Sequence, residues 1–318
     1  MIMYEQGLVS VVIPTYKRSA MLTRAIRSVV NQTYKNIEIL VVDDNEPGDE
    51  YSIAAKKLIQ NLNIPQVRLV TQPKHINGAA ARNAGIREAK GEYICFLDDD
   101  DLYMPNKIER QLEVLSKKSS EVGGVSCLKI FFKGDKLTHI SETWEPSSTQ
   151  SLDVMSKELN IQTGTVLLRR ECLDKAGYFD PNLRRHQEVQ LMSYFTDKYR
   201  IDLIEEILTI IDGSDLANRP DYEKLKGFKE DFFKSVDPLL SKYSRADRKF
   251  VINNHRTELA WVMYRDISKV KGLLMLLQCF TSWRVVKSFF NRYVGKKKDY
   301  NRINNYPNKD YILSLIKS

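Results

Sequence analysis

Short apolar, β-branched runs alternate with segments of helical periodicity through the first hundred residues of the chain. A bounded run of four to eight such residues is typical of a buried strand, and apolar positions three and four apart are typical of a helix. Strands are predicted over residues 9–13, 37–42, 67–70 and 93–97. Helices are predicted over residues 19–30 (with Ser19 as the N-cap), 52–62 and 78–90. This alternation predicts an α/β fold with a mostly parallel sheet and helices on both faces.

The pattern changes after about residue 120. Strands are predicted over residues 125–132, 163–168 and 201–211, and a helix over 187–198. Residues 212–222 carry Gly213 and Pro220 and are typical of a linker. Helices are then predicted over residues 223–242, 245–267 and 270–293, followed by a short tail. We therefore expect an α/β domain over residues 1–215 and a helical region over residues 216–318.

Composition excludes several classes of protein. With 318 residues and 42% hydrophobic residues, the chain can bury a large core. The four cysteines are widely spaced, which argues against a zinc site or a disulfide framework. The N-terminal segment lacks the features of a signal peptide, and no apolar stretch reaches the length of a membrane span. The sequence therefore predicts a cytoplasmic location.

The net charge of +8 is concentrated near the C-terminus. Between Ile267 and Lys298 there is no Asp or Glu, and there are eight Lys and Arg residues. These residues are interleaved with apolar ones from Leu273 to Phe290, a pattern typical of a cationic amphipathic helix or helix pair. The pattern favours binding to an anionic membrane surface, such as the inner face of the cell membrane, over binding to nucleic acid. A core-packing helix, or one that forms a homo-oligomer, is the alternative.

Three predicted strands end in polar residues that could form a site. The first is followed by Pro14, Thr15 and Tyr16, the second by Asp43 and Asp44. The fourth runs into the four carboxylates of residues 98–101. Because open parallel sheets bind ligands at the carboxyl ends of their strands, we expect these groups to gather at one edge.

The four consecutive aspartates are the most informative of these groups. Carboxylates this close repel one another unless a cation neutralises them, and Mg²⁺ or Mn²⁺ typically takes one or two carboxylates together with substrate phosphates. A solvated acidic turn before the helix near Pro105 is the alternative. Asp44 could accept the N3–H of a uracil or thymine, and the alternative is that it belongs to an ordinary Asp-rich turn. Tyr16 could stack on the base, and the alternative is that its ring only packs against the protein.

Taken together and in this order, the motifs resemble family 2 of the inverting glycosyltransferases, which have the GT-A fold. The matching segments are VSVVIPTY (9–16), SVVNQT (28–33), VVDD (41–44), GAAARNAG (78–85), GEYICFLDDDD (91–101), YMP (103–105) and GYFD (177–180). The resemblance covers about residues 8–211. It implies a transferase that uses a nucleoside-diphosphate sugar as its donor.

The resemblance also assigns roles to residues. It places Pro14, Thr15, Tyr16, Asp43, Asp44, Arg82, Asp98 and Asp99 at the nucleotide, with Asp99 at the ribose. It assigns the Mn²⁺ or Mg²⁺ to Asp100 together with Asp98, although four identical residues leave the register open. The catalytic base is implied at Glu188, where Asp is the commoner residue in the family, and His186 is the alternative base.

The predicted reaction moves a sugar from a nucleotide sugar to a hydroxyl of a saccharide or lipid-linked saccharide, as in bacterial surface polysaccharide synthesis. The expected donor is a UDP-sugar, and a dTDP-sugar is the alternative. A sugar nucleotidyltransferase is one alternative, but the usual glycine-rich phosphate loop is missing from residues 14–18. A non-catalytic protein that binds sugar nucleotides is the other.

Overall fold

The computed structural model describes residues 4–134, 136–214, 220–293, 303 and 306–317. It contains a nine-stranded sheet in the order β3-β2-β1-β4-β8-β6-β9-β5, with β7 paired to β6. The strands are β1 (Glu5–Thr15), β2 (Ile37–Asp43), β3 (Val67–Thr71), β4 (Gly91–Phe96), β5 (Leu102–Tyr103), β6 (Val122–Lys133), β7 (Lys136–Ile140), β8 (Leu167–Arg169) and β9 (Arg200–Asp212). Strands β3, β2, β1 and β4 are parallel, and β8 runs antiparallel between β4 and β6. Strand β9 is parallel to β6. The predicted mostly parallel sheet is therefore confirmed.

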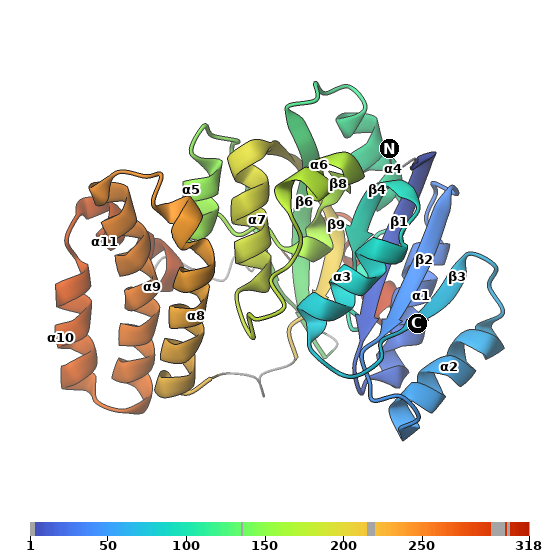
Figure 1. Cartoon of the computed structure of the whole chain (residues 1–318), viewed down its shortest axis with the longest axis horizontal. Coiled ribbons are helices and arrows are strands. Elements are labelled where there is room, and N and C mark those ends of the chain that lie inside the picture. The colour runs from blue at the N-terminus through green and yellow to red at the C-terminus, as the bar shows by residue number, and fades with distance from the viewer. Residues whose placement is uncertain (1–3, 135, 215–219, 294–302, 304–305, 318) are drawn as a thin grey trace.

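Helices cover both faces of the sheet (Figure 1). Alternate residues of β1 point to opposite faces, so Val11 and Ile13 lie in one core and Val12 in the other. The first core includes α1 (Ser19–Val30), α2 (Glu50–Leu62), α4 (Lys107–Leu115) and α13 (Lys309–Lys317). The second includes α3 (Gly78–Glu88), α6 (Arg170–Ala176) and α7 (Gln187–Lys198).

The remaining helices form a layer beside the sheet domain (Figure 1). They are α8 (Tyr222–Leu240), α9 (Arg245–Asp266), α10 (Lys269–Cys279) and α11 (Trp283–Tyr293). Leu152 and Met155 of α5 (Gln150–Met155) share a buried cluster with Phe232 of α8 and Val251 of α9. This cluster joins the helical layer to the domain that carries the sheet. Within the described residues, no helix has the length and apolarity needed to cross a bilayer.

Four details differ from the predictions. Helix α1 begins at Ser19, but its N-cap residue is Arg18. Residues 163–165 form a 3₁₀ helix instead of a strand, because the backbone N–H of Thr165 bonds to the carbonyl of Gln162 at 3.0 Å. The predicted helix over 270–293 is two helices, since Ser282 accepts a bond from the N–H of Val285 at 3.4 Å and starts α11. The prediction missed the short elements β5, β7, α5 and α6.

Residues 215–219 of the predicted linker and the lysines at 296–298 lie outside the described residues.

Small residues bring α3 into close contact with the sheet. Gly85 lies so close to β1 that an added Cβ would be 2.3 Å from Val12 Cγ1 and 3.1 Å from Val42 Cγ2. Real Cβ atoms do not approach other atoms this closely, so only glycine fits here without movement of the backbone or the strand. The glycine that ends the GAAARNAG motif therefore sets the distance between α3 and the strands that end at the candidate site.

We predict that Gly85→Ala lowers the free energy of unfolding by roughly 1–3 kcal/mol, as overpacking of a core typically does. Urea denaturation of single and double variants measures this effect. The double variant Gly85→Ala/Val12→Ala should lose less than the sum of the two single variants, because removal of the Val12 side chain removes the clash. Gly227→Ala, where nothing lies within 4 Å of the added Cβ, is the control and should not destabilise the protein. Strict additivity would contradict the proposed contact.

Candidate active site

The three predicted motifs meet at the carboxyl edge of the parallel strands. Thr15, the last residue of β1, pairs with Asp43, the last residue of β2. The backbone N–H of Leu97 bonds to the carbonyl of Val12 at 3.0 Å, which carries the chain from β4 into the aspartate run. The hydroxyl of Thr15 donates to Asp99 Oδ2 at 2.7 Å. This edge therefore connects the end of β1 to the carboxylates after β4.

Asp43 and Asp44 have different surroundings although they are adjacent. Asp43 is buried and bonded within the protein, because Oδ1 accepts from the backbone and side-chain nitrogens of Asn45 and Oδ2 accepts from Ser52 Oγ at 2.6 Å. Asp44 accepts from the side chain of Gln72 and from the N–H of Ile76 at 3.2 Å. The contacts of Asp43 are those of a residue that shapes the loop.

His75 joins Asp44 to Tyr16 and was missed by the sequence analysis. Its Nδ1 lies 3.0 Å from Asp44 Oδ2, and its ring stacks on Tyr16 with centroids 4.0 Å apart and planes 15° apart. Burial raises the pKa of Asp44, whereas the N–H of Ile76 and the nearby His75 oppose the rise. Tyr16 is 39% exposed, so its ring also faces solvent. Pro14, which pairs with Val42, precedes this stack on β1.

The four aspartates of the run point in different directions. Arg82 Nη2 donates to Asp98 Oδ1 at 2.5 Å, and Arg18 Nη1 pairs with Asp100. Asp101 is buried and accepts the backbone N–H of Asp212 at 2.9 Å. With Asp99 bonded to Thr15, two members of the run stabilise the protein's own structure and two are held by arginines.

The electrostatics of the run indicate a shortage of positive charge. The pKa of Asp99 is raised to about 7, chiefly by burial and also by the neighbouring Asp100 and Asp98, and the hydroxyl of Thr15 and the charge of Arg18 oppose this rise. Burial also raises the pKa of Asp100 and of Asp101, and Asp98 adds to both rises. A cation near these carboxylates would relieve this repulsion.

The donor set fits a metal shared with a diphosphate. Within the described residues, no three His, Cys, Asp or Glu side chains are grouped so that they could hold a metal ion. Mg²⁺ and Mn²⁺, however, are often bound by one or two carboxylates with phosphate oxygens completing the shell. Asp98, whose side chain is 43% exposed, and Asp100 are the members of the run that could provide these ligands.

Arg82 lies between the aspartate run and the predicted base. It is buried on α3, and a Cβ at Gly78 would be 3.0 Å from its Nη1 atom, so glycine leaves room for the guanidinium. Burial raises the pKa of Glu188, Arg82 opposes the rise and Asp98 adds to it. Arg82 is therefore the cation that both carboxylates share.

Glu188 lies in the first turn of α7, as the sequence predicts. Thr163 Oγ1 in the 3₁₀ helix donates to Glu188 Oε1 at 2.5 Å. His186, the alternative base, is the N-cap residue of α7 with φ of 64° and packs against Phe232 and His255. A carboxylate with a raised pKa is a stronger proton acceptor, so Glu188 is suited to the role of general base.

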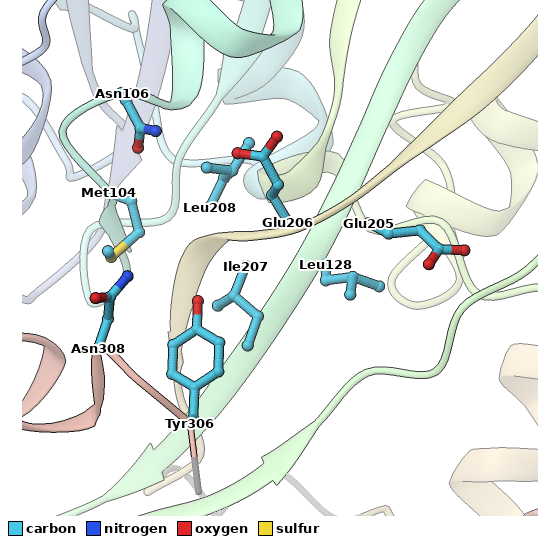
Figure 2. A pocket seen from close by; sticks show the side chains of 9 residues that line it. All are labelled: Met104, Asn106, Leu128, Glu205, Glu206, Ile207, Leu208, Tyr306 and Asn308. Atoms are coloured by element: carbon cyan, nitrogen blue, oxygen red, sulfur yellow. The ribbon is translucent and has the colours of Figure 1, made fainter. Parts of the chain in front are cut away.

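A cleft of about 770 Å³ opens beside Glu188, within the size range of small-molecule sites. Arg82 and Glu188 line it from the sheet domain, Lys157 from the end of α5, and Glu258 and Arg292 from α9 and α11. A second cavity of about 290 Å³ is shown in Figure 2 and is lined by Met104, Asn106, Leu128, Glu205, Glu206, Ile207, Leu208, Tyr306 and Asn308. No predicted site residue lines that cavity, so the larger cleft is the candidate site.

A buried polar cluster supports the wall of the cleft next to α7. Lys229 Nζ lies 3.1 Å from His255 Nδ1 and also bonds to Glu258, which pairs with Lys157 at 2.8 Å. His255 Nε2 lies 2.9 Å from the carbonyl of Met155. A carbonyl accepts only, so Nε2 carries the proton, and Nδ1 accepts from Lys229. Burial lowers the pKa of His255 well below its ordinary value, and Lys229 and Lys157 lower it further.

Comparisons with known proteins show which family of proteins the chain resembles. A family model described as Glycosyl transferase family 2 matches residues 10–177. An uncharacterized glycosyltransferase of Rickettsia felis is 31% identical over 74% of this chain and 38% of its own length. The minor teichoic acid biosynthesis protein GgaB of Bacillus subtilis is 30% identical over 62% of this chain and 22% of its own length. The chain thus spans less than two thirds of each of these relatives.

Solved structures show the same fold. TarS of S. aureus (residues 1–349, in complex with UDP) has a TM-score of 0.53 at 15% identity, over 89% of this chain and 91% of that one. The mannosyltransferase PcManGT of Pyrobaculum calidifontis, in complex with GDP-Man and Mn²⁺, has a TM-score of 0.56 at 14% identity, over 97% of this chain and 84% of that one. At these identities the likeness concerns the fold alone.

We predict that acid destabilises the protein partly through His255. Its folded-state pKa is depressed, so as the pH falls below about 6.5 the unfolded chain binds a proton that the folded protein does not. A fully buried neutral histidine then costs about 1.4 kcal/mol of unfolding free energy per pH unit. The drop in Tm between pH 7.5 and 5.5 should therefore be smaller in His255→Gln than in the wild type.

The charged groups that face His255 are Lys229, Lys157, His186 and Glu258, and all four are present in both proteins. The quantity to compare is therefore the drop in Tm of the wild type minus the drop in Tm of His255→Gln. Should His255→Gln not fold, long-range ¹H–¹⁵N NMR of the wild type should show a neutral ring protonated at Nε2 at pH 6. A doubly protonated ring at that pH would contradict the assignment.

Proposed function

Because the chain belongs to glycosyl transferase family 2 and has the GT-A fold that the sequence predicts, we propose that it is an inverting glycosyltransferase acting on a nucleoside-diphosphate sugar. The observation that carries this proposal is the position of Arg82 between Asp98, after β4, and Glu188, on α7, beside a cleft of about 770 Å³. The arrangement puts a proton acceptor next to residues suited to a metal and a diphosphate. We assign catalysis to residues 1–215 and a supporting role to residues 216–318.

The donor that we propose is a UDP-sugar. Tyr16 offers a partly exposed ring for the base, and Asp44 is an acceptor for a base N–H after rearrangement of its bonds to Gln72 and His75. Solved structures of TarS hold UDP and UDP-GlcNAc, and the structure of PcManGT holds GDP-Man, so proteins of this fold accept more than one base. A dTDP-sugar would make the same N–H contact.

Asp100 and Asp98 would hold the Mn²⁺ or Mg²⁺. The bound metal would neutralise charge on the diphosphate as it leaves. Arg18 and Arg82, which pair with these carboxylates, would then turn to phosphate oxygens, to which arginine binds well. Thr15 would keep Asp99 oriented at the ribose.

Glu188 would accept the proton of the acceptor hydroxyl as that oxygen attacks the anomeric carbon. Its raised pKa favours this transfer, and the bond from Thr163 Oγ1 orients the carboxylate. A single displacement inverts the anomeric configuration. A retaining double displacement would need a second carboxylate as nucleophile next to the sugar, and we assign Asp98 to the metal instead.

The acceptor that we propose is a saccharide or lipid-linked saccharide of a bacterial surface polymer. The name of the relative GgaB, a protein of minor teichoic acid biosynthesis, supports this class of product. A sugar nucleotidyltransferase would release pyrophosphate and a non-catalytic binding protein would release nothing. Release of nucleoside diphosphate therefore separates the proposed reaction from both alternatives.

Helix α10 supports a peripheral membrane contact. Gly272, Leu276 and Cys279 are buried on one side of this helix. Four residues at spacings of three and four form its exposed apolar stripe, namely Val270, Leu273, Leu274 and Leu277, each more than half exposed. Trp283 at the start of α11 is 77% exposed.

The occupant that we propose for this face is an anionic bilayer. Lys269, Lys271 and Lys287 are exposed on the same two helices, and residues 267–298 contain no acidic side chain. In a symmetric dimer through this face the lysines would meet one another, whereas anionic lipid would neutralise them. The lipid surface would also bring the protein to a lipid-linked acceptor.

We predict that Glu188→Gln lowers kcat by about 10²–10⁴-fold, as removal of a general base typically does, while UDP still raises Tm in the presence of Mn²⁺. Asp100→Ala should lose both turnover and the Mn²⁺-dependent part of that stabilisation. Glu113→Gln on the exposed part of α4 is the control and should behave as the wild type. Normal turnover in Glu188→Gln would reject this residue as the base.

We predict that the wild type co-sediments with vesicles containing phosphatidylglycerol and less with pure phosphatidylcholine. Leu273→Gln/Leu277→Gln should reduce the partition coefficient at least tenfold, because two leucine side chains no longer enter the bilayer. Ile53→Gln, which removes a residue 58% exposed on α2, is the matched control. Equal pelleting of the double variant and the wild type would reject a membrane-binding role for this face. If the wild type forms a dimer that the double variant does not form, the face binds a second copy of the chain instead.

A further inference from the structure

The wall of the cleft contains side-chain atoms without hydrogen-bond partners inside the protein. Among the described residues, five buried side-chain nitrogen or oxygen atoms lack a partner, and four of them belong to residues that line the cleft. They are Arg82 Nε, Gln162 Oε1, His186 Nε2 and Arg292 Nη1. Because buried polar atoms are almost always bonded, a concentration of unbonded ones along one cleft indicates a surface built for a polar ligand.

Arg292 and Gln162 are the two members of this set that the sequence analysis did not connect to the site, and Arg292 is the charged one. It lies on α11, and its Nη2 atom donates to the carbonyl of Lys157 at 3.0 Å and lies 3.5 Å from that of Ser156. These contacts fix the plane of the guanidinium and leave Nη1 unbonded. The helical layer thus contributes an oriented cationic donor to the cleft that Glu188 also lines.

The cleft has an excess of positive charge. Six of the lining residues are Lys or Arg and four are Glu. Two of the four, Glu158 and Glu258, bond to cations that do not line the cleft, Arg284 and Lys229. Two of the six cations likewise pair with acids outside the cleft, Arg82 with Asp98 and Arg184 with Asp231, so the excess of two positive charges is unchanged. Positive charge in a concave, partly buried site favours anionic ligands.

Aromatic side chains line the same cleft. Trp144 and Phe131 are both partly exposed there, and Phe131 stacks on His139 with centroids 5.5 Å apart. Flat apolar rings with nearby polar groups suit the faces of sugar rings, which combine C–H and hydroxyl groups. Both kinds of contact are therefore available within one cleft, beside the residue that we propose as the base.

We propose that this cleft binds an acceptor that carries a phosphate group next to its sugar, and that Arg292 of the helical layer contacts the phosphate. The proposal rests on the proposed function and deepens it by naming the class of acceptor. A guanidinium held on one side presents its remaining N–H groups to a phosphate in well-defined geometry. The phosphate could be a phosphodiester of a polymer chain or the diphosphate of a lipid-linked saccharide, and the chemistry of the contact is the same.

Isothermal titration calorimetry of the full chain with three probes tests the proposal. The probes are a short poly(glycerol phosphate), a water-soluble short-prenyl diphosphate sugar and neutral maltotriose. The wild type should bind at least one phosphate probe about tenfold or more tightly than maltotriose, and 300 mM salt should weaken that binding. The tighter of the two phosphate probes identifies the source of the phosphate. Equal affinity for all three probes would overturn the proposal.

Arg292→Gln should weaken the preferred phosphate probe about tenfold, as loss of a charge-assisted hydrogen bond typically does, and leave maltotriose unchanged. Lys249→Gln removes the same charge from an exposed position on α9, in the same helical layer but outside the cleft, and should change the affinity less than twofold. If Arg292→Gln does not fold, Asn291→Asp, at an exposed position that lines the cleft, should weaken the phosphate probes several-fold. Equal losses in the cleft variant and in Lys249→Gln would overturn the proposal.

A thermal-shift measurement with UDP and Mn²⁺ separates this inference from the proposed function. Arg292→Gln and Lys249→Gln should be stabilised by UDP as the wild type is, because neither residue belongs to the proposed donor site. Stabilisation by UDP without binding of either phosphate probe would reject the acceptor class alone. Absence of stabilisation by UDP in all three proteins would reject the donor site and the proposed function with it.

Discussion

A single buried guanidinium holds the two carboxylates of the candidate site together. Asp98 follows a strand of the sheet and Glu188 begins a helix ninety residues later, and without a cation between them their negative charges would repel. Arg82 bonds to Asp98 at 2.5 Å and opposes the rise in the pKa of Glu188. Its position depends in turn on Gly78 and Gly85, which allow α3 to lie close to the sheet and the guanidinium to fold back along the helix.

The aspartate run shows how one charge pattern can serve two purposes. Asp99 and Asp101 are turned inward, to Thr15 and to the backbone of Asp212, and connect the loop after β4 to β1 and β9. Asp98 and Asp100 are bonded to arginines whose charge a metal and a phosphate could replace. Residues 98–101 form a turn in which the N–H of Asp101 bonds to the carbonyl of Asp98 at 3.1 Å, and the turn directs its four side chains to different parts of the protein. The two remaining carboxylates are those that the resemblance assigns to the metal.

The helical layer contributes side chains to the wall of the cleft and to the buried cluster behind it. Its α8 and α9 helices contribute Lys229, His255 and Glu258 to a buried cluster against which His186 packs, two residues before the predicted base. Its α11 helix completes the cleft with Arg292. A site composed of side chains from both parts of the chain is held in shape by their packing, so the geometry next to Glu188 depends on residues far from the family motifs.

The sequence alone determined the longer strands of the sheet, the longer helices of the α/β domain, the motifs at the strand ends and the position of Glu188 at the start of a helix. These features depend on local periodicity and on residue types that follow one another along the chain, whereas the short elements β5, β7, α5 and α6 carry too little pattern to be predicted. It could not distinguish four identical aspartates, and it assigned residues 163–168 to a strand where a 3₁₀ turn brings Thr163 to Glu188. Only the tertiary structure decided which carboxylates face inward, that His75 stacks on Tyr16, that the apolar stripe of α10 is exposed, and that Arg292 faces the cleft. The physical reason is that each of these depends on a contact between segments distant in sequence, whose packing no local pattern records.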